Sequence, residues 1–181
     1  MFTKKYWNST FTKLKSTHYL TIMAMMIALK VILSSFYIPI GENLHITITF
    51  ILVAIEASIL GPGAGMLSGA ITDIVSFMLF PDGAFFIGYV LTSMLGELVY
   101  GLFFYQKEVT LKNIIPAKIV INYFVNVCVG SLWSYMLYSK GYLYYFTKSI
   151  IKNTTLLPIE ILILWVSFKV IKPIIQKNKL D

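Results

Sequence analysis

The chain has 181 residues, of which 57% are hydrophobic and 13% are charged, and its formal net charge is +7. A soluble domain is nearer 45–50% apolar and about a quarter charged, so this composition excludes an ordinary water-soluble fold and indicates a polytopic membrane protein. The basic charge does not indicate nucleic-acid binding, because the lysines flank apolar runs and the sequence has no arginine for bidentate contacts to phosphates or bases.

Six apolar segments follow one another along the chain, each close to the length of about 20 residues that a membrane span needs. Gly61-Pro62-Gly63 and Pro81-Asp82-Gly83 are strong turn signals between them, and Pro116 is predicted in the first turn of the fifth segment. The tyrosine-rich stretch 138–147 is predicted to be a loop. The predicted spans cover residues 19–37, 46–60, 64–80, 85–105, 114–137 and 149–170.

The distribution of lysines predicts the orientation, because cytoplasmic ends of spans carry an excess of basic residues. With both termini inside, only Lys140 and Lys148 lie outside, with Lys152 at the border. The sequence therefore predicts an all-α integral membrane protein of six transmembrane helices, N-in and C-in, in a single transmembrane domain over residues 1–181. Residues 1–17 and 171–181 are predicted to be basic cytoplasmic tails. The first apolar segment is too long for a cleaved signal peptide and lacks a cleavage site.

Small residues recur every four positions on several predicted spans, a spacing that lets helix backbones approach closely in lipid. Gly61, Gly65 and Gly69 form one such strip, which is predicted to pack within the bundle. Further strips consist of Gly88, Thr92 and Gly96, and of Ala24 and Ala28 in the first span.

Ionisable side chains inside a span are costly, so each one predicts a partner or a water-filled cavity. One interpretation is structural ion pairing. A second places Asp73 near mid-membrane, with aromatic and amide groups of neighbouring spans in the outer half and lysines at the mouth. The ionisable residues within or near the spans are Lys30, Glu56, Asp73, Glu97, Lys118 and Glu160.

The outer half thus offers groups that suit a flat heterocycle with acidic substituents. Aromatic faces can stack on the ring, Asp73 can accept from ring N–H groups, amides can pair with ring acceptors, and lysines can hold carboxylates. We expect no enzymatic activity, metal or cofactor, because His18 and His45 lie far apart and the sequence has no P-loop.

Over nearly its whole length, the chain resembles the substrate-binding S components of energy-coupling factor (ECF) vitamin transporters, and among them the folate-specific members. The resemblance lies in residues 24–34 (AMMIALKVILS), the run 50–69 with LGPGAG at 60–65, the stretch 73–88 with FPDGAFFIG at 80–88, and residues 152–160 (KNTTLLPIE).

This resemblance implies a division of labour in a bacterial plasma membrane. The chain would capture folate from outside with high affinity, while a separate transmembrane coupling protein and two cytosolic ATPases supply the energy. Ala24 and Ala28 map onto the alanine motif that packs on the coupling protein. Lys30 stands where the family leads us to expect arginine and is included among the candidate ligand-binding residues. The loop 35–44, with Ile38, Pro39 and Ile40, would cap the pocket.

The resulting hypothesis assigns each part of folate to residues of this chain. It places the pterin between Asp73, Asn122 and Asn126, the aromatic linker among Phe77, Phe80, Phe85 and Tyr89, and the glutamate near Lys152 or Lys148. Three alternatives remain open: an S component for riboflavin, thiamin or a pantothenate-like acid; a secondary transporter or small channel acting alone; and a membrane enzyme or assembly factor.

Overall fold

The structure is a computed structural model that describes residues 4–41, 44–81, 85–138 and 140–177, with the backbone alone at 4–5, 39–41, 44–46 and 172–177. The predicted turn residues Asp82 and Gly83 lie outside the described part, as do the side chains of Pro39 and Ile40. In chain order the elements are α1 (Lys4–Thr12), the 3-10 turn η1 (Lys13–Lys15), α2 (Thr17–Ser34), β1 (Ile38–Gly41), β2 (Leu44–Ile46), α3 (Phe50–Leu60), α4 (Pro62–Leu79), α5 (Ile87–Phe104), α6 (Leu111–Ile119), the π-helix η2 (Val120–Val129), α7 (Gly130–Leu137) and α8 (Tyr142–Lys177).

Within the described residues, five helical segments are long and apolar enough to cross a bilayer. They are α2, α4, α5, the continuous segment α6–η2–α7 and α8, and they confirm a helical membrane fold. The predicted helix over 46–60 is wrong at its start, because β2 occupies 44–46 and α3 begins only at Phe50. With 11 residues, α3 is about 16 Å long and is therefore shorter than the hydrocarbon layer.

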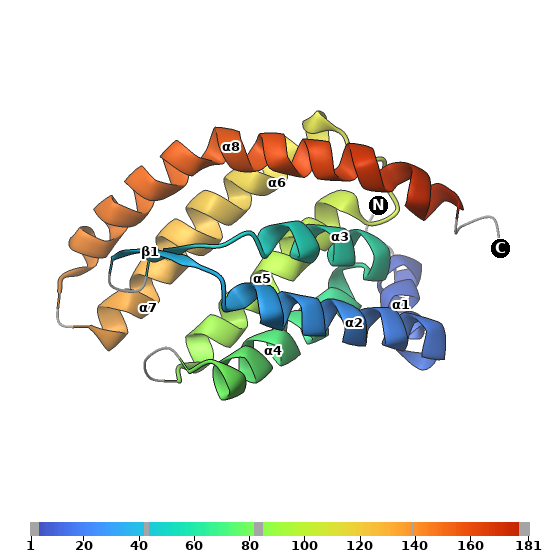
Figure 1. Cartoon of the computed structure of the whole chain (residues 1–181), viewed down its shortest axis with the longest axis horizontal. Helices are drawn as coiled ribbons and strands as arrows, with labels where there is room; N and C mark the ends of the chain where they lie inside the picture. Colours follow the sequence, from blue (N-terminus) through green and yellow to red (C-terminus); the bar gives the residue numbers. More distant parts are fainter. Residues whose placement is uncertain (1–3, 42–43, 82–84, 139, 178–181) are drawn as a thin grey trace.

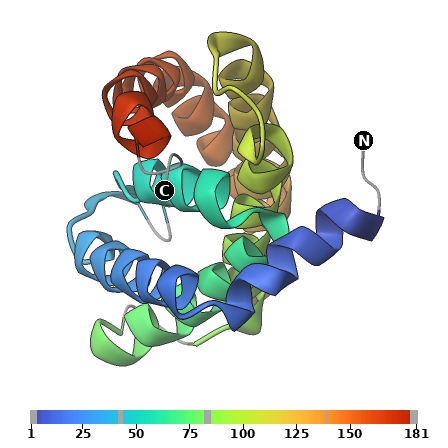
Figure 2. The same ribbon diagram turned by 90° about the vertical axis from the view of Figure 1, so that its right-hand side faces the viewer.

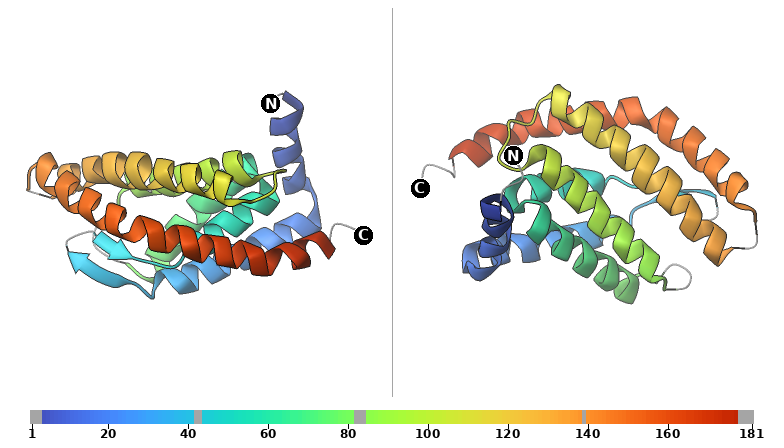
Figure 3. Two further views of the ribbon diagram at one scale, coloured as in Figure 1. Left: turned by 90° about the horizontal axis from the view of Figure 1, so that it is seen from above. Right: turned by 180° about the vertical axis from the view of Figure 1, so that it is seen from behind.

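The helices are arranged so that α3 lies in the middle of the bundle, between α2, α4, α5 and α8 (Figures 1 and 2). The β1–β2 hairpin lies at one end of the molecule, together with the start of α8 and the end of α7. At the opposite end lie α1, the α3–α4 turn and the end of α8 (Figures 1 and 3). The two ends therefore carry different structures, a hairpin at one and a helical elbow at the other.

The core around α3 is made of small and aromatic residues. Ala54 and Ala57 of α3 are fully buried and let α5, α6 and α8 approach, while Tyr100 and Phe104 of α5 fill the space beside them. The α4–α5 contact is equally close, because a Cβ atom at Gly69 would lie 2.8 Å from the Ser93 carbonyl oxygen. This agrees with the predicted glycine strip on α4, and tight van der Waals packing of this kind is the main attraction between helices in lipid.

The N-terminal segment, predicted to be a tail, contains the helix α1, which packs across the α3–α4 elbow. Gly61 has φ +85°, a conformation that residues with a side chain rarely adopt, and Pro62 follows it in the first turn of α4. Thr10 of α1 is fully buried against this elbow, and the Lys13 ammonium donates to the Ile59 carbonyl. These contacts explain why a polar, basic stretch is ordered here.

Three other expectations are corrected by the structure. The stretch 138–147 is not a loop throughout, because α8 already begins at Tyr142. Pro116 lies in the second turn of α6, since that helix begins at Leu111, earlier than predicted. Gly96 does not take part in close helix packing, because a Cβ atom there would meet nothing within 4 Å. It borders a cavity instead.

Candidate functional site

A cavity of about 480 Å³ lies between α2, α4, α5, the α6–η2–α7 segment and α8. It occupies the half of the bundle that is nearer the hairpin, because its walls come from the end of α2, the end of α4 and the beginnings of α5 and α8 (Figure 1). The segment between β2 and α3 adds Thr47 and Thr49. Non-helical backbone in a membrane protein is tolerated where it lines such a cavity, and this segment does so.

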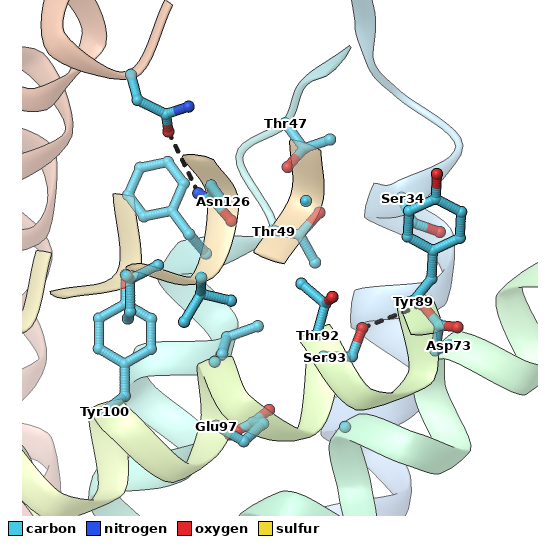
Figure 4. Close-up of a pocket in the computed structure, with 18 of the residues that line it drawn as sticks. Ser34, Thr47, Thr49, Asp73, Tyr89, Thr92, Ser93, Glu97, Tyr100 and Asn126 are labelled. Carbon is cyan, nitrogen blue, oxygen red and sulfur yellow. Dashed lines mark hydrogen bonds between the residues drawn. The ribbon is translucent and has the colours of Figure 1, made fainter. Parts of the chain in front are cut away.

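Asp73 is half-buried in the cavity wall on α4, as the sequence hypothesis requires (Figure 4). One of its carboxylate oxygens accepts a hydrogen bond of 3.0 Å from the Ser93 hydroxyl of α5. Neither Lys30 nor Lys118 forms an ion pair with it. The carboxylate is therefore oriented by a neutral neighbour and can still accept hydrogen bonds from a ligand.

Tyr89, Asn126, Lys152 and Lys30 are the other predicted ligand-binding residues that line the cavity. Tyr89 lies close to Asp73 on the same side, and Asn126 lies on another side of the cavity (Figure 4). The Asn126 amide nitrogen donates to the Asn153 side chain at 3.3 Å, which leaves its own oxygen as an acceptor. The π-helix brings Ile121, Val125 and Asn126 into one wall, and such wide turns often occur at functional sites.

Lys30 lies at the floor of the cavity and is fully buried. Its ammonium forms ion pairs with Glu56 of α3 and, at 2.7 Å, with Glu97 of α5. It also donates to Ser68 of α4 at 3.2 Å. Four helices thus meet at one cation, so Lys30 serves first to join α2 to the rest of the bundle.

Asn122 does not line the cavity, although the sequence hypothesis places it beside Asp73. Its amide nitrogen donates to Glu160 of α8 at 2.7 Å, and Lys118 pairs with the same Glu160 oxygen at 2.9 Å. Asn122 is fully buried in this link between the α6–η2–α7 segment and α8. It therefore lies behind the wall, where it holds Glu160 in place.

The three predicted phenylalanines lie outside the described cavity wall. Phe77 and Phe85 pack against each other with ring centroids 5.1 Å apart, where α4 ends and α5 begins. Phe80 and Phe85 are each 48% exposed. Lys148 is also exposed, and its ammonium lies 4.6 Å from the centroid of the Tyr144 ring. The structure thus places these four residues near the hairpin end of the bundle and not in the cavity wall.

Sequence reasoning missed the hydroxyl groups that make up much of the cavity wall. They recur at helical spacing, as in Thr72 and Ser76 of α4 or Ser131 and Ser134 of α7, and this repeat is the signal that could have revealed them. The lining hydroxyl residues include Ser34, Thr47, Thr49, Thr72, Ser76, Thr92, Ser93, Ser131, Ser134 and Ser149.

The predicted docking residues Ala24 and Ala28 lie on the outer face of α2 and are exposed. Met25, Leu29 and Ile32 of the same helix are also exposed, by 45–61%. In the described part of the chain, α2 thus presents an exposed apolar surface of small and aliphatic residues that do not line the cavity.

A bundle of apolar helices around a polar cavity defines a membrane-embedded solute-binding protein. The profile of the family described as "ECF transporter, substrate-specific component" matches residues 18–176, so the chain belongs to this family. The family is the substrate-binding part of a transporter and not an enzyme.

Individual relatives of the chain are proteins named as folate transporters. The chain is 29% identical to the "Folate transporter FolT" of Clostridium novyi (strain NT) over 166 residues, which are 92% of this chain and 96% of that protein. It is 28% identical to the protein of the same name from Leuconostoc mesenteroides subsp. mesenteroides over 80% of this chain and 81% of the relative. Among solved structures, one described as "Crystal structure of FolT bound with folic acid" aligns with a TM-score of 0.78 at 27% identity, covering 83% of this chain and 92% of the other.

Proposed function

We propose that this chain is the folate-binding subunit of an ECF-type importer, which captures folate from the extracellular side. The observation that carries this proposal is the cavity of about 480 Å³ with Asp73 in its wall, in a chain similar to proteins named as folate transporters. Cavities of about 300–1,000 Å³ accommodate drug-sized ligands. The similar structure described as bound with folic acid further supports the choice of ligand.

The geometry refines how folate would be held. The pterin N–H groups donate to Asp73, the Asn126 carbonyl oxygen and the wall hydroxyls pair with other ring atoms, and Tyr89 offers an aromatic face. Lys152, on α8, binds the glutamate carboxylates. Phe77, Phe80, Phe85 and Lys148 would act at the entrance, and Asn122 and Lys30 would support the walls.

The remaining parts of the proposal concern topology and partners. Six membrane passes, with the short α3 as the second, place α1 and the end of α8 on the cytoplasmic side and the hairpin outside, in a bacterial plasma membrane. The apolar face of α2 around Ala24 and Ala28 would dock on a transmembrane coupling protein, which two cytosolic ATPases energise. The hairpin over 38–46 would cap the cavity.

Mass spectrometry of small molecules released from the purified, detergent-solubilised chain tests the choice of ligand. Cells are grown with folate, riboflavin, thiamin and pantothenate at equal concentrations, and the protein is denatured after purification. We expect folate to be released in near-stoichiometric amount. Enrichment of another vitamin instead of folate would refute the assignment and support an S component of different specificity.

A further inference from the structure

The floor of the cavity contains one buried cation and two buried carboxylates. Lys30 of α2 and Glu56 of α3 are 0% exposed, and Glu97 of α5 is 1% exposed. The Lys30 ammonium is in contact with both carboxylates. We call these three residues the floor triad. It borders the cavity through Lys30 and Glu97.

Every proton that the triad can donate is already in use. The three ammonium hydrogens of Lys30 are directed to Ser68, Glu97 Oε1 and Glu56. The Ser68 hydroxyl hydrogen is donated to Glu56 Oε1 at 2.5 Å. Within the described residues, Glu97 Oε2 is buried without a hydrogen-bond partner. It faces Gly65 of α4, where a Cβ atom would lie 3.2 Å from it.

No neighbouring charge among the described residues compensates the excess negative charge of the floor triad. Lys30 and Glu56 are the charged groups that act on Glu97, so two carboxylates share one ammonium. Lys118 of α6 forms its own pair with Glu160 of α8. Asp73 of α4 accepts a hydrogen bond from the Ser93 hydroxyl. Tyr100 follows Glu97 by one turn of α5, and its buried side chain is a neutral phenol. With both glutamates ionised, the triad would carry a net negative charge at a buried position, and a buried group with an uncompensated charge normally takes up a proton instead.

We propose that Glu56 and Glu97 hold one proton between them, which makes the floor triad neutral. The proton comes from water and belongs to the pair, since both carboxylates contact the one Lys30 nitrogen. A protonated Glu97 Oε2 removes the unpaired anionic oxygen that faces Gly65. The inference concerns the ligand-free protein and does not depend on which ligand the cavity takes.

Infrared spectroscopy of the purified full chain detects such a proton directly, because a protonated carboxyl has a C=O stretching band that is separate from the amide bands and shifts in D2O. We expect this band in the wild type at neutral pH. It disappears in Glu56→Gln and also in Glu97→Gln, because in each variant the remaining glutamate pairs one-to-one with Lys30 and ionises. It persists in Glu160→Gln and in Asp73→Asn, which alter carboxylates outside the triad.

Other outcomes would overturn the proposal. A wild type without the band has no proton on the pair. A band that persists in both Glu56→Gln and Glu97→Gln but vanishes in Asp73→Asn places the proton on Asp73. Two triad variants are used so that a folding failure in one still leaves a test.

The pH dependence of the melting temperature gives a second readout. The native chain holds a proton that the unfolded chain has released at neutral pH, so the unfolded state binds fewer protons and stability falls as the pH rises. We therefore expect the wild-type melting temperature to decrease from neutral to alkaline pH more steeply than that of Glu97→Gln, with Glu160→Gln retaining the wild-type slope. Equal slopes in wild type and Glu97→Gln would contradict the proposal.

Discussion

Asp73 is the residue whose position carries most of the proposed ligand recognition. It lies in the cavity wall, is half-buried and accepts one hydrogen bond from a neutral hydroxyl. A carboxylate in this position favours a ligand with two adjacent N–H donors over one that offers acceptors alone, because acceptor atoms would meet an unpaired negative charge.

Replacing this carboxylate tests the role. Hydrogen bonds to charged groups contribute about 1.5–3 kcal/mol, so Asp73→Asn should weaken folate binding by about 10-fold to 100-fold in calorimetry of the purified protein. Glu108→Gln is a matched control, since Glu108 is exposed between α5 and α6 and outside the cavity. Unchanged affinity in Asp73→Asn would remove Asp73 from the site.

The two lysines on the first turns of α8 can be separated by a second experiment. Lys152 lines the cavity, whereas Lys148 is exposed beside Tyr144. Lys152→Met should therefore weaken folate binding by about tenfold or more, through loss of charge-assisted hydrogen bonds to the carboxylates. Lys148→Met should have a smaller effect.

Folate dimethyl ester provides the ligand control, because its carboxylates are neutralised. Its affinity should be nearly the same for the wild type and for Lys152→Met in the same titrations. If Lys152→Met weakened the ester and folate equally, the lysine would support the wall and not bind the carboxylates.

At the residue scale, the sequence predicted a cavity lined by a carboxylate, an amide and a lysine, but it did not predict correctly every residue that lines this cavity. Lys30, Asp73, Tyr89, Asn126 and Lys152 line the cavity, and their contact with a ligand stays a prediction. Asn122, one helical turn before Asn126, faces α8 as Asn126 does, because both amide nitrogens donate to Asn153, but Asn122 is also bound to Glu160. Sequence spacing places the two asparagines on one face of the helix and cannot reveal which of them is occupied by groups of a neighbouring helix.

At the scale of elements, hydropathy located the helices but not all of their ends. Residues 46–49 (ITIT) are all β-branched and favour extended backbone. Because they also continue an apolar run, hydropathy predicts that they belong to the helix over 46–60. The start of α8 was predicted wrongly for a different reason. Its tyrosines indicate a loop by composition, while Tyr145, Ser149 and Asn153 recur every four residues and form one buried face of the helix.

The elbow between α3 and α4 is predicted to be sensitive to added volume. A Cβ atom at Gly101 of α5 would lie 2.6 Å from the backbone of Pro62, so Gly101→Ala forces two helices apart. Overpacking of this kind costs about 1–3 kcal/mol, which corresponds to a decrease in melting temperature of about 2–12 °C for a chain of this size.

Gly96→Ala is the matched control for this prediction. It lies on the same helix, and its new Cβ atom would meet nothing within 4 Å. Alanine also favours a helix over glycine, so the melting temperature should stay the same or rise slightly. If both variants melted alike, the contact between Gly101 and Pro62 would not limit the stability of the bundle.

At the scale of the whole molecule, the cavity and the exposed α2 face are separate surfaces, and we propose a separate task for each. Ala24→Trp and Ala28→Trp place bulk on an outer face, away from the cavity. Each should leave folate binding by the purified chain unchanged and abolish folate uptake by cells that express the complete transporter, because small residues are needed where helices approach closely. Leu162→Trp, on a 61% exposed position of α8, is the control and should leave uptake intact.

Persistent uptake in both alanine variants would place the docking surface elsewhere on the molecule. The comparison between binding and uptake is what separates this outcome from a general loss of folding, since a misfolded chain would lose both.

We propose above all that this chain binds folate in the cavity between α2, α4, α5, the α6–η2–α7 segment and α8. The most direct measurement is an isothermal titration of the purified, ligand-free chain with folate and, in parallel, with riboflavin, thiamin and pantothenate. We expect one folate to bind per chain, far more tightly than the other three vitamins. Saturable binding of one of those vitamins, with no heat from folate, would contradict it.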